Sequence, residues 1–182
     1  MARHDSKNAI LDAAEAIVIE SGAARMTLDA VAKRTGVSKG GLIYNFPTKE
    51  ALLKGMIDRM MRRIDEMRED IKAKFPGERS SELAIEMRLF QKGAQDKGIQ
   101  SAALLAVNAA NPDLTRTARE KMRERFNASL TPGPDFTRSA ILYFANMGIH
   151  LADLLNFSIL DKKQKKEIQE ELLRLAGCDD PL

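Results

Sequence analysis

The segment "MTLDAVAKRTGVSKGGLIYNFPTKEALL", residues 26–53, predicts two short helices that a tight turn joins, followed by the start of a longer helix. Thr27 and Ser38 stand at expected N-caps, because their hydroxyl oxygens can accept hydrogen bonds from free backbone amides. The first helix should run to Arg34, and the second should run from the glycine-containing turn to about Phe46. This arrangement is typical of a helix-turn-helix unit that binds DNA.

The rest of the chain also has a helical pattern. Apolar residues recur at helical spacing and no alternating run rich in strand-forming residues occurs, so the expected fold class is all-α with about nine helices. The stripe from Ile10 to Val18 predicts a first helix that Gly22 ends as a C-cap. The remaining helices are expected over residues 48–75, 81–97, 99–110, 111–130, 136–158 and 161–177, with Thr48 and Asp161 as caps.

Composition excludes several classes of protein. The net charge of +3 lies wholly within residues 1–79, which is a small hint of a polyanionic partner. Asp12, Glu15 and Glu20 interrupt the apolar pattern of the N-terminus, which excludes a signal peptide. No uncharged run approaches the roughly 18 residues of a membrane span, so we expect a cytoplasmic protein. The single cysteine, Cys178, excludes an intramolecular disulfide.

The sequence gives no sign of an enzyme. Its two histidines are His4, near the N-terminus, and His150, in an apolar helix. No HExxH segment, metal-spaced cysteine pair, phosphate-binding loop or GxSxG segment accompanies them. We therefore expect no catalytic residues, no metal and no cofactor.

Residues 26–53 resemble the TetR family of bacterial transcriptional regulators. The match includes the spaced threonine, the Gly-Val-Ser turn, the following glycine and the Lys-Glu pair at the start of the long helix. The resemblance implies a helix-turn-helix DNA-binding domain over residues 1–54. It also implies a helical regulatory and dimerisation domain over residues 55–182.

The motif and the chemistry of its side chains together predict the DNA contacts. Backbone amides at the two helix starts suit phosphate oxygens. A lysine in the first turn of the groove helix suits a base or a phosphate, the tyrosine hydroxyl and the asparagine amide suit phosphates, and a lysine at the start of the long helix suits the DNA backbone. The predicted DNA-binding residues are Thr27, Ser38, Lys39, Gly40, Gly41, Tyr44, Asn45 and Lys49.

The groove helix departs from the commonest family pattern at two positions, and its two glycines differ in what they imply. Ile43 replaces a tyrosine and should turn into the core, while Tyr44 faces DNA. Asn45 replaces a histidine and keeps a hydrogen-bond donor without its pH dependence. Gly40 matches the family glycine, where a bare backbone allows close packing or close approach to DNA. Gly41 falls where relatives often carry a base-reading side chain, so it removes one reader.

The family resemblance implies a small-molecule effector, which we expect to be apolar. Isolated polar groups in apolar helices and nearby large apolar residues are the candidate pocket residues. They are Met87, Phe90, Leu104, Asn108, Phe126, Tyr143, Asn146 and His150. For each of them, a purely structural role in the core is the competing interpretation.

The resemblance also implies a homodimer, which fits the nearly all-apolar helix expected over residues 136–158. The candidate interface residues are Ile141, Phe144, Leu151, Leu155, Ile168, Leu172 and Leu175. A dimer predicts a pseudo-palindromic DNA operator, and a repressor that its effector releases from that operator. The alternatives are a monomer, an activator, or a DNA-bound structural or protein-recruiting factor without an effector.

Overall fold

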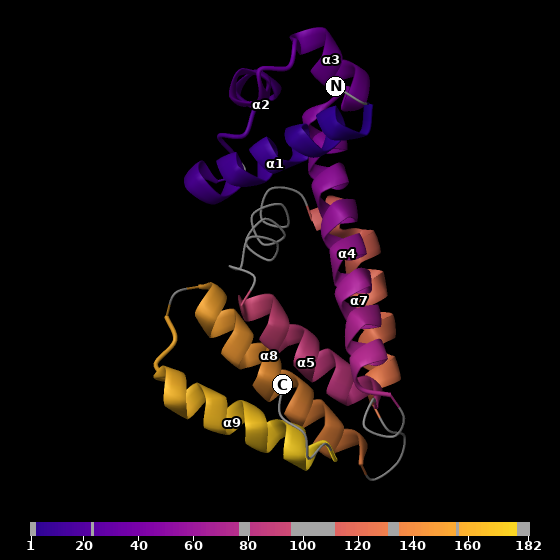
Figure 1. Ribbon diagram of the computed structural model, residues 1–182, viewed down its shortest axis with the longest axis vertical. Helices are drawn as coiled ribbons and strands as arrows, with labels where there is room; N and C mark the ends of the chain where they lie inside the picture. Colours follow the sequence, from indigo (N-terminus) through magenta and orange to yellow (C-terminus); the bar gives the residue numbers. More distant parts are fainter. Residues whose placement is uncertain are drawn as a thin grey trace. The chain divides into compact units, whose positions relative to one another are not determined.

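The computed structural model describes residues 3–22, 24–76, 81–95, 112–130, 135–155 and 157–177 (Figure 1). These residues form helices and connections and contain no strand, which confirms the all-α prediction. The α-helices are α1 (Arg3–Ser21), α2 (Leu28–Thr35), α3 (Lys39–Asn45), α4 (Lys49–Lys74), α5 (Glu82–Gln95), α7 (Arg116–Ser129), α8 (Phe136–Leu154) and α9 (Lys162–Leu175). A 3₁₀ helix, η2 (Pro112–Thr115), precedes α7.

The predicted caps define the helix-turn-helix segment. The Thr27 hydroxyl accepts a hydrogen bond from the amide of Ala30 at 3.1 Å, and the Ser38 hydroxyl accepts one from Gly41 at 3.2 Å. Gly36 ends α2 with a φ of 71°, a left-handed conformation that favours glycine. The turn and both helix starts are therefore where the sequence predicts them.

Caps outside this segment are confirmed as well. Thr48 accepts a hydrogen bond from the amide of Ala51 at 3.0 Å, and Asp161 forms a capping box with Gln164 at the start of α9. Gly22 follows α1 with a φ of 82°.

One predicted helix ends earlier than expected, and another lies outside the described residues. The expectation that the eighth helix runs to Ser158 is wrong, because α8 ends at Leu154. There the carbonyl of Ala152 accepts from the amide of Phe157, five residues later, so the chain leaves the α-helical pattern. The helix expected over residues 99–110 lies outside the described residues.

The chain divides into two compact units. The first unit contains the described residues up to Arg62 and those from Pro112 to Arg119. The second unit contains the described residues within Arg63–Gly98 and Glu120–Leu182. The division within α4 falls later than the boundary of 54/55 that we expected. In the first unit, α1, α2 and α3 gather around the start of α4 (Figure 1). Its buried residues include Ile10, Leu11, Ala14, Val18, Met26, Val31, Leu42, Phe46, Leu52, Leu53 and Met56.

The acidic residues of α1 have arginine partners. Arg59 of α4, only 7% exposed, pairs with Glu15, 8% exposed, at 2.7 Å. The same guanidinium pairs with Asp12 at 2.7 Å. Near the surface, Glu20 accepts two hydrogen bonds from Arg34 of α2, at 2.6 and 2.7 Å. The charges that interrupt the apolar stripe of α1 thus connect it to α4 and α2.

The second unit has its core between α5, α8 and α9, which lie side by side in Figure 1. The core cluster contains Leu83, Ala84, Met87, Leu142, Tyr143, Leu172 and Leu173. A smaller cluster joins Ile71 of α4 to Ile85 and Leu89 of α5. Nearby, the fully buried Arg88 lies over the ring of Phe75, 4.0 Å from its centre.

Ion pairs connect the later part of α4 to two neighbouring helices. Arg68 donates hydrogen bonds to Glu82 and Glu86 of α5. Asp65 pairs with Arg125 and Lys121 of α7. Burial raises the pKa of Glu86, and the positive charge of Arg68 offsets part of that rise. We call this set of charges the α4 ion-pair cluster.

Candidate nucleic-acid interface and candidate effector site

Helix α3 has a buried side and an exposed side. Leu42 is fully buried and Phe46, which follows the helix, is nearly so, which fixes the rotation of α3 against the first unit. Tyr44 is 71% exposed, in agreement with the expectation that it faces outward. Ile43 is 41% exposed, so the expectation that it turns into the core is wrong. Leu42 takes the inward position instead.

Lys39 lies at the exposed start of α3 and pairs with Asp29 of α2. The Nζ–Oδ1 distance is 2.8 Å, and both side chains are largely exposed to solvent. An ion pair this exposed contributes little to stability, so DNA phosphate can replace the carboxylate at small cost. If Lys39 binds DNA as predicted, Asp29 would compete with DNA for it, and sequence reasoning did not include Asp29 in the interface.

Two other predicted contacts have partners within the chain. The Asn45 side-chain amide donates to the Gly41 carbonyl at 2.9 Å, which holds it against α3 and leaves one amide hydrogen to donate elsewhere. Lys49, at the start of α4, donates to the carbonyl of Ala24 at 3.4 Å. The exposed Thr27 caps α2, and the exposed Ser38 caps α3.

The adjacent glycines of α3 have different surroundings. A Cβ added to Gly40 would have no atom within 4 Å, so close packing within the chain is not the reason for that glycine. Close approach to DNA stays a prediction. A Cβ added to Gly41 would lie 3.1 Å from Val37 Cγ1 and 3.2 Å from Ser38 Oγ. A side chain at position 41 would therefore crowd the first turn of α3.

The candidate dimer residues fall into two groups. Ile141, Phe144, Leu155 and Ile168 are exposed, whereas Leu151 and Leu175 are half-buried and Leu172 lies in the core cluster. Three further exposed apolar side chains, Phe136, Phe157 and Ile159, lie at or just beyond the ends of α8. Sequence reasoning did not include these three among the candidate interface residues.

Six of the eight candidate pocket residues lie in or against the core of the second unit. These are Met87, Phe90, Phe126, Tyr143, Asn146 and His150, whereas Leu104 and Asn108 lie outside the described residues. The ring of Tyr143 has its centre 5.6 Å from that of Phe90 and 4.9 Å from that of Phe126. The centre of the His150 ring lies 5.6 Å from that of Phe90. We call Phe90, Phe126, Tyr143 and His150 the aromatic cluster.

Two buried amide side chains accompany the aromatic cluster. Asn146 is 1% exposed and donates to the Met87 carbonyl at 3.0 Å. Its Oδ1 has no hydrogen-bond partner among the described residues, and neither does Nε2 of Gln91, which is 7% exposed. Met87 and Gln91 are four residues apart and share a face of α5. One unused acceptor and one unused donor therefore lie along the same packed helix pair.

The ionisable members of the aromatic cluster are neutral. Burial lowers the pKa of His150, partly opposed by the charge of Asp153. Burial raises the pKa of Tyr143 to about 12. A molecule seated among these side chains would meet rings and neutral dipoles, with Asp153 as a charge near His150 and with Glu86 and Arg125 as charges near Tyr143.

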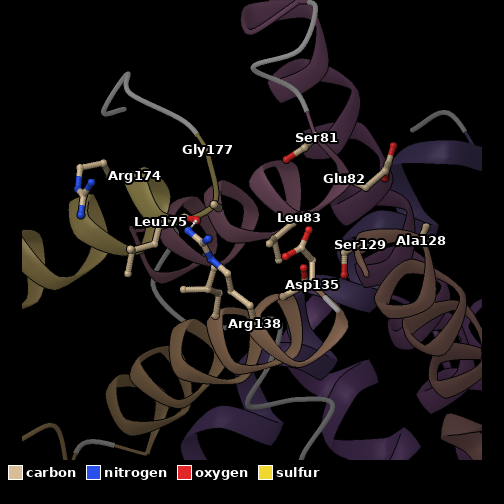
Figure 2. Close-up of a pocket in the computed structure, with 13 residues that line it drawn as sticks. Ser81, Glu82, Leu83, Ala128, Ser129, Asp135, Arg138, Arg174, Leu175 and Gly177 are labelled. Atoms are coloured by element: carbon tan, nitrogen blue, oxygen red, sulfur yellow. Dashed lines mark hydrogen bonds between the residues drawn. The ribbon is translucent and has the colours of Figure 1, made fainter. Parts of the chain in front are cut away.

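A cavity of about 400 Å³ lies elsewhere in the second unit, between the starts of α5 and α8 and the ends of α7 and α9 (Figure 2). Three of its four charged lining side chains have partners within the chain. Arg138 donates to the Leu175 carbonyl at 2.6 Å, Arg174 pairs with Glu171 and Glu82 pairs with Arg68. None of the six described candidate pocket residues lines it. Because most of its charged side chains already have partners, the cavity does not indicate a class of ligand.

The described part of the chain lacks both a metal site and a membrane-spanning helix. It contains no cluster of three or more His, Cys, Asp or Glu side chains suited to a metal ion. None of its helices combines the length and hydropathy needed to cross a membrane.

Solved structures share the fold at low sequence identity. The secondary repressor NalD of the MexAB-OprM multidrug efflux pump of Pseudomonas aeruginosa is 18% identical, with a TM-score of 0.64 over 96% of this chain and 94% of its own. A transcriptional regulator from Rhodococcus sp. Rha1 is 19% identical, with a TM-score of 0.66 over 97% and 100%. The multidrug binding protein EbrR, complexed with imidazole, is 22% identical, with a TM-score of 0.61 over 95% and 92%.

Sequence models of protein families match both units. Residues 10–56 match the model of bacterial regulatory proteins of the tetR family. Residues 83–177 match the tetracyclin repressor-like C-terminal domain. No curated protein matches the sequence at a significant level. The two models describe the two parts of DNA-binding regulators rather than enzymes, and the chain belongs to the TetR family of bacterial transcriptional regulators.

Proposed function

We propose that this regulator is a homodimeric repressor that binds a pseudo-palindromic operator and is released from it by a small neutral effector. The observation that carries the DNA-binding part is the orientation of α3. Leu42 is buried while Lys39, Ile43 and Tyr44 are exposed. A groove helix needs this orientation to present side chains to base edges.

The remaining predicted contacts suit the DNA backbone. We assign phosphate contacts to the capped start of α2 at Thr27, to Ser38 and Asn45 of the α3 segment, and to Lys49. Lys49→Ala should weaken binding to all sequences equally and lower the salt slope by about 1 per protomer. Replacement of a base-reading Lys39 should instead change sequence preference. Equal losses on operator and random DNA for Lys39→Ala would assign it to phosphate.

Exposed apolar side chains of α8 and α9 support the homodimer. Ile141, Phe144 and Ile168 expose apolar surface that a second copy would cover. Two copies would place their α3 helices about one DNA turn, roughly 34 Å, apart, which is why we expect a two-fold operator. Equilibrium sedimentation of the wild type and of Phe144→Glu tests this. A dimer in both, or a monomer in both, would contradict the assignment.

The two buried amides support an effector site in the second unit. Among the described residues, Gln91 Nε2 and Asn146 Oδ1 have no hydrogen-bond partner. A buried polar atom without a partner costs stability, and a ligand with one acceptor and one donor would recover that cost. Since the surrounding rings are neutral and apolar, we propose a neutral effector with an apolar or aromatic body and an amide-like edge. The structural neighbours NalD, a repressor of a multidrug efflux pump, and EbrR, a multidrug binding protein, are compatible with an apolar effector.

Such an effector can act only through different affinities for the DNA-binding and released states. Three matched probes test its chemistry: benzamide has a donor and an acceptor, acetophenone has an acceptor only, and benzoate is charged. We expect benzamide to raise the melting temperature most and to release operator DNA. Gln91→Met, of similar size, should melt at a higher temperature than the wild type without ligand and lose the benzamide response.

The same experiment separates the alternatives. No response to any of the three probes, together with unchanged melting of Gln91→Met, would contradict the effector site. It would favour a DNA-bound factor without an effector. A regulator that binds operator DNA works where the chromosome is, so we also propose a cytoplasmic location.

A further inference from the structure

We infer that Ile43 reads the methyl groups of thymine in the major groove, and so determines one base pair in each half of the operator. The inference rests on the proposed operator binding and adds to it the chemistry of one recognised base. Its starting point is the exposed position of Ile43 on α3.

Ile43 lies on the same exposed side of α3 as the predicted readers. It follows Lys39 by four residues and Gly40 by three, and residues at these spacings share a helix face. The buried side chains Leu42 and Phe46 fix that face outward, because rotating Ile43 inward would expose one of them. The isoleucine therefore stays exposed until something outside the unit covers it.

Apart from the exposed Tyr44, the other predicted DNA contacts of the α3 segment read bases poorly. Gly40 and Gly41 have no side chains. Lys39 pairs with Asp29, and its ammonium is a point charge on a flexible chain. Asn45 already donates to the Gly41 carbonyl. The branched side chain of Ile43 is stiff about its first torsion angle, so it loses little rotational freedom on binding.

The chemistry of the DNA major groove indicates which base Ile43 contacts. Of the base-pair edges in the major groove, only that of thymine carries an exposed methyl group, at C5. An isoleucine offers no hydrogen bond, so it would leave the polar edges of guanine, cytosine and adenine without partners. Gly40, whose Cβ position is open, removes the side chain that would otherwise hold α3 away from the bases.

The test replaces thymine by deoxyuridine, which lacks only the methyl group. The operator is first selected from random DNA with the wild-type protein. Each thymine in both half-sites is then replaced singly. We expect one position per half-site where the replacement weakens binding about four-fold, the factor for one buried methyl-sized group. In a second operator, cytosine replaces the thymine at that position. Changing this cytosine to 5-methylcytosine should recover part of the affinity.

Variants assign the effect to Ile43. Ile43→Ala should bind the unmodified operator about four-fold more weakly per half-site and show no further loss with deoxyuridine. Ile43→Val, which keeps both branches at Cβ, should retain part of the sensitivity. Ile19→Ala is the matched control: Ile19 is 45% exposed on α1, and its replacement should change neither affinity nor deoxyuridine sensitivity.

Two results would overturn the inference while operator binding stands. One is a wild type that is insensitive to deoxyuridine at every thymine. The other is an Ile43→Ala variant that keeps the full deoxyuridine penalty, because another residue would then contact the methyl group. If the wild type selects no sequence from random DNA, the proposed operator binding itself fails.

Discussion

The ring of Phe46 occupies the space beside Gly55 that a side chain at position 55 would need. A Cβ added to Gly55 would lie 2.6 Å from Cε1 of Phe46 and 3.4 Å from Cδ2 of Leu11. Because Phe46 ends α3 and Gly55 lies on α4, this contact sets how closely the groove helix approaches the long helix. A glycine inside a helix, which costs about 1 kcal/mol relative to alanine, is here required by packing.

We predict that Gly55→Ala destabilises the protein by about 1–3 kcal/mol, because the Phe46 ring must move and overpacking outweighs the gain in helix propensity. Urea unfolding measures the change. Gly40→Ala is the control, since its Cβ would enter open space, and it should stabilise the protein by up to about 1 kcal/mol. Equal effects of the two substitutions would refute the packing argument.

The buried pair between Arg59 and Glu15 predicts a large loss of stability when one partner is removed. Arg59→Met leaves the Glu15 carboxylate buried without its cation, which should cost about 3–5 kcal/mol. Arg34→Met is the matched control, because Arg34 holds Glu20 in the same two-bond geometry at the surface, and its replacement should change stability little. Chemical unfolding measures the free energy of unfolding of both variants. Equal losses would contradict the argument that burial sets the cost.

The pair between Lys39 and Asp29 predicts a gain of DNA affinity. Asp29→Asn releases the Lys39 ammonium and removes a negative charge, so binding to operator and to random DNA should tighten roughly two- to five-fold. Fluorescence anisotropy at two salt concentrations measures this. In a Lys39→Ala background the gain should shrink. An Asp29→Asn protein with weaker binding would place the carboxylate on the DNA-binding side as a contact of its own.

Burial of His150 predicts a loss of stability in acid. The pKa of His150 is lowered in the folded state, so below its ordinary value of 6.5 the unfolded chain binds a proton that the folded chain does not. The contribution of His150 is therefore present at neutral pH and declines as the pH falls through 6.5 towards the folded pKa. The difference between the melting temperatures at about pH 7.5 and at about pH 5.5 should be smaller for His150→Gln than for the wild type. An unchanged difference would contradict the assignment.

Local features of this chain could be predicted from sequence, and contacts between distant residues could not. Thr27, Ser38, Thr48 and Asp161 are caps because each hydroxyl or carboxylate bonds an amide three residues later, and such signals are contained in a few neighbouring letters.

The features that the sequence did not predict correctly depend on how the helices pack against one another. The exposure of Ile43 depends on which of two adjacent apolar residues faces the core, and only the packing of Leu42 and Phe46 decides that. Glu15 pairs with Arg59 on another helix, and the ring of Phe46 at the end of α3 lies beside Gly55 of α4. No local sequence pattern predicts either contact. The unused amide atoms of Gln91 and Asn146 likewise appear only once α5 and α8 lie together.

The α4 ion-pair cluster has a mechanical consequence for the second unit. Arg68 and Asp65 are less than one helical turn apart, yet the first is bonded to α5 and the second to α7. Sliding α4 along either neighbour would pull a partly buried charge from its counter-charge, which is strongly unfavourable. The later part of α4 is therefore tied to both α5 and α7, and sliding it along either helix would break ion pairs.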